Sequence, residues 1–138
     1  MARWISLWLF VACLSMAGTA RAAEKADSVV DRLAKVEVFA FGGVGFAGVI
    51  SPGEMDYRLL LSQPSAEAHF ERLFAVGDPQ AKGYALVGLR HLNSEKFKAL
   101  AASLRSSKIA VSTMHGCLMR HETMVAILAD IQAGNYSK

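Results

Sequence analysis

Helix start and stop signals recur at short intervals through the middle of the chain, and they constrain the fold more than any other feature. Ser51 can serve as an N-cap, Pro52 suits the first helical position, and Glu54 follows three residues after the cap. Similar start signals stand at Pro64-Ser65, Asp78-Pro79 and Asn93-Ser94, and Gly77 ends the helix that precedes the second of these. These signals predict four consecutive helices, over about 52–62, 65–76, 79–92 and 94–104.

Apolar residues recur at helical spacing within these segments, and also within 24–35 and 122–132. The chain has 138 residues, of which 53% are hydrophobic, and this length suits one domain. We therefore expect a compact, mainly α-helical domain of about five or six helices with one or two short β-strands. Six side chains are predicted to pack together as its helical core: Phe70, Leu73, Leu86, Leu89, Phe97 and Leu100.

Two segments outside these helices are rich in β-branched or aromatic residues and predict the β element. Residues 36–41 read VEVFAF, and residues 109–119 begin with β-branched residues and contain a central Gly116. The parts 36–41 and 109–113 could pair with each other, although the pattern does not fix a register.

The block from Phe70 to Leu104 resembles one helical hairpin of a HEAT or armadillo repeat. Gly77-Asp78-Pro79 and Ala85-Leu86, with Leu89 on the second helix, carry the resemblance, which covers about a quarter of the chain. The resemblance implies stacked helices, but a solenoid needs about three repeats and the sequence has no convincing second copy. An ordinary helical domain predicts the same pattern, so no family is assigned.

Residues 1–22 have the pattern of a secretory signal peptide. Arg3 precedes an uncharged stretch from Trp4 to Gly18, and Ala20-Arg21-Ala22 suits a cleavage site. We expect export to the periplasm or the exterior, with the remaining domain spanning 23–138. Two alternatives stay open, namely an uncleaved N-terminal anchor and lipidation at Cys13.

Removal of residues 1–22 would leave a nearly neutral chain with one cysteine. The full sequence has 15 Lys and Arg against 12 Asp and Glu, and the segment takes away Arg3 and Arg21 but no acid, which changes the net charge from +3 to +1. A nucleic-acid partner is therefore not expected. Cys117 would be the single cysteine, so the exported domain would contain no internal disulfide.

The glycine-rich stretch 43–48 reads GVGFAG and matches the G-x-G-x-x-G spacing of dinucleotide-binding loops. Its context does not fit, because Val49-Ile50-Ser51 separates the last glycine from the helix that begins at Pro52, and no second strand with an acidic end follows. A glycine-rich apolar loop or hairpin is the preferred interpretation, and we expect its apolar side chains to be core. Membrane contact through residues 38–50 is the less favoured alternative.

A second cluster lies at residues 114–121, where imidazole, thiol and thioether groups alternate along the chain. On a strand, His115, Cys117 and His121 would project from one face, and their donors suit zinc or copper. A metal site or a Cys117–histidine nucleophile pair is therefore an alternative hypothesis. We favour a structural role, with Cys117 buried and slow to react with thiol reagents.

No known catalytic motif, phosphate loop or calcium loop occurs in the sequence. The sequence therefore favours a small exported, non-catalytic interaction protein that has no cofactor and binds a protein partner. The alternative is a small metal-binding or thiol-dependent protein that uses the segment from His115 to His121.

Overall fold

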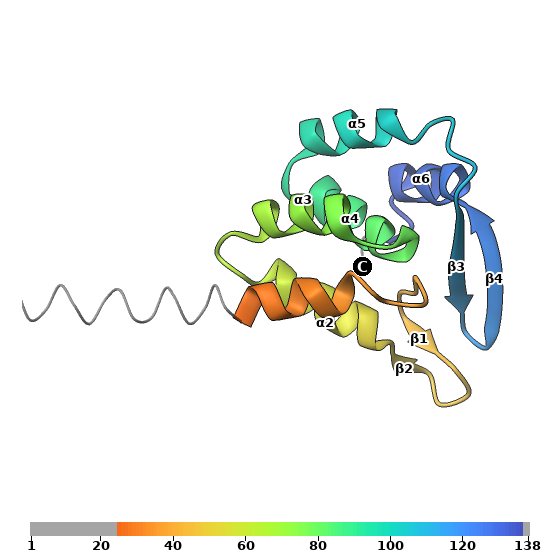
Figure 1. The fold of residues 1–138 in the computed structure, drawn as a ribbon. Helices are drawn as coiled ribbons and strands as arrows, with labels where there is room; N and C mark the ends of the chain where they lie inside the picture. The colour runs from red at the N-terminus through yellow and green to blue at the C-terminus, as the bar shows by residue number, and fades with distance from the viewer. Residues whose placement is uncertain (1–24, 137–138) are drawn as a thin grey trace, which may run out of the picture.

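The computed structural model describes residues 25–136, so the predicted signal segment 1–22 and Cys13 lie outside the described residues. The described part is mainly helical, with six helices and two antiparallel β-hairpins (Figure 1). A helix over residues 25–33 comes first. The other elements are β1 (Gly43–Val44), β2 (Val49–Ile50), α2 (Pro52–Leu61), α3 (Ala66–Val76), α4 (Pro79–Leu92), α5 (Ser94–Ser103), β3 (Ala110–His115), β4 (Leu118–Thr123) and α6 (Met124–Ala133).

The four central helices begin and end close to the predicted positions. The Ser51 hydroxyl accepts a hydrogen bond from the Glu54 N–H, and the Asn93 side chain accepts one from the Lys96 N–H. Both bonds satisfy an amide that the helix itself leaves free at its N-terminus. Because these signals act within a few residues, the sequence alone was sufficient to predict the helix boundaries.

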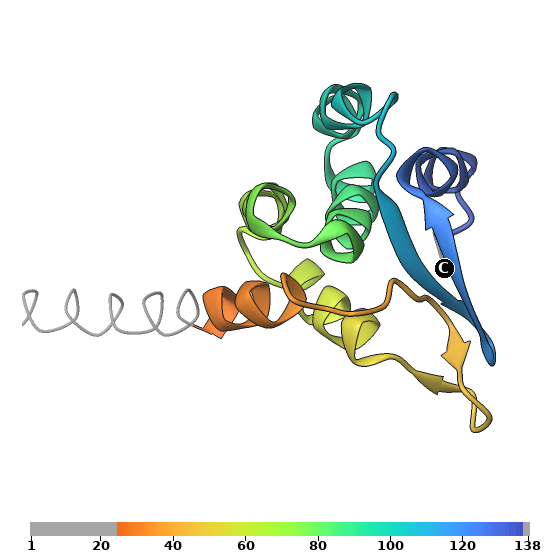
Figure 2. The same cartoon turned by 45° about the vertical axis from the view of Figure 1, so that its right-hand side comes forward.

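Helix α4 lies at the centre of the domain, between α3, α5, α6 and strand β3 (Figure 2). Gly88 allows the close approach of α3, since a Cβ at this position would lie 2.6 Å from the Phe70 ring. The predicted helical core is confirmed, with five of its six members buried and Leu100 partly buried against them. The cluster also includes residues of the first helix and of α6, such as Val30, Leu33, Ile127 and Ile131.

The β structure differs from the prediction in its extent. Residues 36–41 form no strand, and only Phe39 makes an isolated parallel bridge to Thr113, which confirms that the two predicted segments meet. The predicted single strand 109–119 is instead two antiparallel strands, β3 and β4, joined at Gly116-Cys117. Gly116 has a φ of +57°, a conformation that glycine adopts at little cost and that permits the tight turn.

The glycine-rich stretch is a hairpin, which confirms the preferred interpretation of this segment. Gly43 pairs with Ile50 and Val44 with Val49, and residues 45–48 form the connecting loop. A Cβ on Gly43 would lie 2.9 Å from the carbonyl oxygen of Gly48, so only glycine fits between the two strands here. Within the described range, no helix has both the length and the apolar character needed to cross a membrane.

Candidate interaction surface

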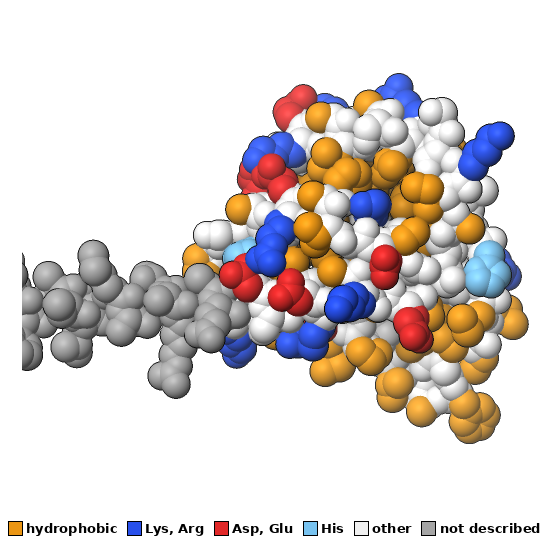
Figure 3. All heavy atoms as spheres, viewed as in Figure 1, with side chains coloured by type: hydrophobic (Ala, Val, Ile, Leu, Met, Phe, Trp, Pro, Cys, Tyr) orange, Lys and Arg blue, Asp and Glu red, His pale blue; other side chains and the backbone are white. Residues whose placement is uncertain are grey.

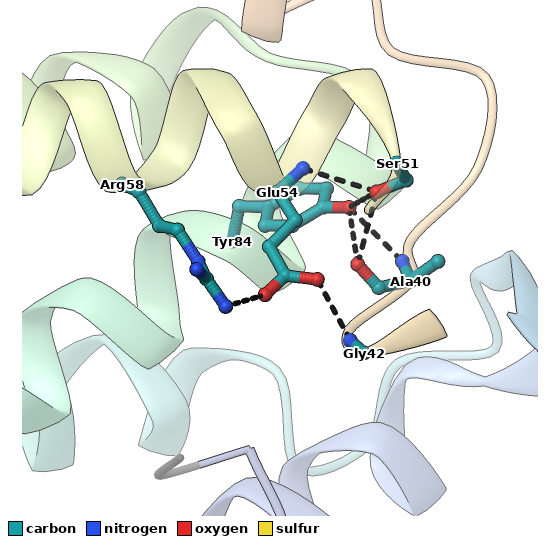
Figure 4. Close-up of polar contacts among 6 residues, drawn as sticks. All are labelled: Ala40, Gly42, Ser51, Glu54, Arg58 and Tyr84. Carbon is teal, nitrogen blue, oxygen red and sulfur yellow. Dashed lines mark hydrogen bonds and ion pairs between the residues drawn. The ribbon is translucent and has the colours of Figure 1, made fainter. Parts of the chain in front are cut away.

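A buried carboxylate anchors the root of the β1–β2 hairpin. Glu54 is 2% exposed, on the first turn of α2. Its Oε2 accepts a hydrogen bond of 2.7 Å from the Gly42 N–H, and its Oε1 accepts one of 2.5 Å from the Arg58 guanidinium (Figure 4). Charge-assisted bonds of this kind are stronger than those between neutral groups, so Gly42 is firmly held beside α2.

A second polar contact fixes the chain just before this point. The Tyr84 hydroxyl donates to the Ala40 carbonyl at 2.8 Å and accepts from the Ala40 N–H at 3.0 Å, and Ser51 lies 3.4 Å from the same hydroxyl (Figure 4). Burial raises the pKa of Tyr84, so the hydroxyl keeps the proton that it donates. Ala40 and Ser51 are therefore tied to each other and to α4, and Gly42 is tied to α2, so these contacts close the base of the hairpin.

The two hairpins are also joined near their tips. The Gly45 N–H donates a hydrogen bond of 2.9 Å to the Gly116 carbonyl, and Val44 bridges to Gly116. The loop 45–48 and the turn at 116–117 consequently lie side by side at one end of the molecule (Figures 1 and 2). The β1–β2 hairpin is thus held at its base and near its tip.

This end of the molecule exposes a group of large apolar side chains. Phe46 is 103% exposed, so it makes essentially no contact with the other described residues. The expectation that this stretch is core is wrong for Phe46, Val49 and Ile50. Phe39 and Val44 are buried, and Phe41 packs against the core. The reason is geometric, because the β1–β2 hairpin projects beyond the helices, and apolar side chains gather on the surface at this end of the described residues (Figure 3). We call these exposed residues the hairpin-tip surface: Phe46, Val49, Ile50, Leu118 and Met119.

The predicted cysteine and histidine cluster lies at the same end, but its geometry differs from the expectation. Cys117 is exposed, so the prediction that this cysteine is buried is wrong. Because the chain reverses at the two-residue turn, side chains on β4 do not continue the alternation between faces that an unbroken strand would have. His115 pairs with Leu118 and His121 with Ser112, which places the two imidazoles on opposite faces of the hairpin.

The histidines have neighbours of their own on these faces. His121 Nδ1 lies 3.2 Å from the Ser112 hydroxyl, and His115 Nε2 lies 3.8 Å from Glu122. Among residues 25–136, no three Cys, His, Asp or Glu side chains come together in a way that could hold a metal ion. The turn places Cys117 and His115 near the tip of the hairpin, whereas His121 lies further along β4, opposite Ser112.

Glu54 also lines a cavity, together with residues that the sequence did not indicate as a site. Its volume is about 160 Å³, and Glu54, Tyr57, Arg58 and Tyr136 are part of its lining. Burial raises the pKa of Tyr57 and of Tyr136 to about 12, so both phenols are neutral. The only sequence signal here was Glu54 itself, which reads as part of a capping box rather than as a buried acid.

No protein-family model, no curated protein and no solved structure matches this chain.

Proposed function

We propose that this chain is an exported, non-catalytic binding protein that docks through the hairpin-tip surface. The observation that carries the proposal is the full exposure of Phe46 on a hairpin that is fixed at both ends. A large apolar side chain in contact with water is unfavourable, and a contiguous group of them is typical of an interaction site. The predicted signal segment supports export.

The anchoring of the hairpin supports binding because it lowers the cost of ordering the surface. Complete burial of one side chain such as Phe, Leu or Met contributes about 1.5–3 kcal/mol. Part of that gain is normally lost when a mobile loop becomes ordered on binding. Here Gly42, Ala40 and Ser51 are already bonded to α2 or α4, so less ordering is required.

Site-specific photo-cross-linking in the producing cell tests this proposal. A photoreactive phenylalanine analogue at position 46 should give a discrete adduct, because the side chain would be buried in the complex. The matched control is position 76, where Val76 is 61% exposed on α3 and lies outside the hairpin-tip surface. Adducts that are equal in amount and kind at the two positions would contradict the proposal.

A thiol-dependent or metal-binding role remains the alternative, and the exposure of Cys117 is the observation that favours it. The proposed metal ligands are His115, Cys117 and His121, of which the two histidines lie on opposite hairpin faces. Zinc or copper binding would therefore require the turn to rearrange. Stoichiometric metal that survives dialysis and is lost in a His115→Ala, His121→Ala variant would support this alternative.

We expect the Cys117 thiol to react with a soluble thiol reagent at nearly the same rate in the folded protein and in the urea-unfolded chain. Solvent access limits such reactions when the thiol is buried, and this side chain is exposed. Parallel stopped-flow labelling of both states measures the ratio of rates. Strong protection in the folded state would mean that the turn is covered in solution.

A further inference from the structure

We propose that the partner of the hairpin-tip surface is a lipid bilayer with anionic headgroups, into which the two tips insert; this rests on the proposed function. The chemistry of the tip segment supports a lipid partner. Residues 38–53 contain no Asp, Glu, Lys or Arg. The Gly45 N–H bonds to Gly116 and the Gly48 N–H to Gly45, so these amides would enter the interface already paired.

The charges beside the tips are complementary to an anionic surface. Arg120 is exposed, next to Met119 in β4. Of the nearby acids, Glu54 is buried against Arg58, and Glu122 accepts a bond from Thr113 and lies 3.8 Å from His115. The charge that we assign to the headgroups is therefore that of Arg120. Basic side chains next to an apolar insertion are attracted to anionic lipid headgroups.

The shape of the surface favours a bilayer over a folded protein. A stable protein interface buries about 800 Å² on each partner and is flat or complementary to a pocket. Here Phe46 is fully exposed in the loop of the β1–β2 hairpin, and the other apolar side chains lie on the short strands beside the two turns: Val49, Ile50, Leu118 and Met119. A bilayer interface accepts projecting aromatic and aliphatic side chains without a preformed pocket, because the lipids rearrange around them.

Vesicle binding of the exported protein, purified from its producing cell, tests this proposal. The vesicles contain phosphatidylcholine alone or phosphatidylcholine with phosphatidylglycerol. We expect stronger sedimentation with the anionic vesicles. Phe46→Ser should weaken this binding by about tenfold, which corresponds to the loss of one buried aromatic side chain. The control Val76→Ser should bind as the unsubstituted protein does.

A second measurement reports insertion directly and is independent of any contribution from an N-terminal anchor. In Phe46→Trp, the emission after subtraction of the unsubstituted protein's spectrum should shift to shorter wavelength with anionic vesicles, whereas Val76→Trp should show no shift. No shift at position 46, or equal vesicle binding by Phe46→Ser, would overturn the lipid proposal. If the lipid proposal fails in this way, a discrete protein adduct from position 46 in the cell would still support the proposed function. If that adduct is also absent, the lipid proposal and the proposed function are both contradicted.

Discussion

Glu54→Ala should lower the free energy of unfolding by about 3 kcal/mol, because it removes two charge-assisted hydrogen bonds and leaves a void. The Gly42 N–H would lose the acceptor that lies 2.7 Å away, beside α2. Arg58 would lose its partner as well, although its exposed side chain can turn to water. Urea denaturation followed by far-ultraviolet circular dichroism measures the change.

Two other variants separate the role of the buried carboxylate from a general effect of removing an acid. Glu95→Ala deletes an acid whose side chain is 80% exposed and pairs with Lys98 on the surface of α5, so stability should change by less than about 0.5 kcal/mol. Glu54→Gln keeps an acceptor for Gly42 and should show an intermediate loss. Equal stability of Glu54→Ala and Glu95→Ala would contradict the anchoring role of Glu54.

The anchoring of the hairpin also connects this stability effect to binding. If Glu54 positions residues 40–42, then its loss frees one root of the β1–β2 hairpin while Phe46 itself is unchanged. The hairpin-tip surface would then have to be ordered during binding, and affinity would fall for that reason. We therefore expect Glu54→Ala to weaken binding through Phe46, although Glu54 does not belong to the hairpin-tip surface.

The helices were predictable from sequence because their signals are local. Ser51 with Pro52 and Asn93 with Ser94 each act within one turn, and the structure uses Ser51 and Asn93 as the caps. The buried faces were predictable as well, because apolar residues such as Phe70 recur at the spacing that places them on one side of a helix.

The candidate site was less predictable because it depends on contacts between distant segments and on one turn. The expectation that His115 and His121 share a face assumed an unbroken strand, and the turn at Gly116 reverses the chain and the alternation. The exposure of Phe46 could not be read from its apolar neighbours, since a buried loop and a projecting hairpin have the same composition. The buried role of Glu54 depends on Gly42, twelve residues away, and no spacing rule connects them.

Leu89→Ala should lower the free energy of unfolding by about 2–5 kcal/mol, the cost of losing buried contacts and leaving a cavity. Leu89 is fully buried on the central helix α4, next to the position where Gly88 admits the Phe70 ring. Leu92 on the same helix is 39% exposed, so Leu92→Ala makes the same chemical change with less burial and should cost under about 1 kcal/mol. Denaturant titration of both variants compares them directly.

Because α4 contacts α2, α3, α5, α6 and β3, a loss at Leu89 should weaken the whole domain in one cooperative transition. A loss at Leu89 no larger than that at Leu92 would mean that α4 is not the centre of the core.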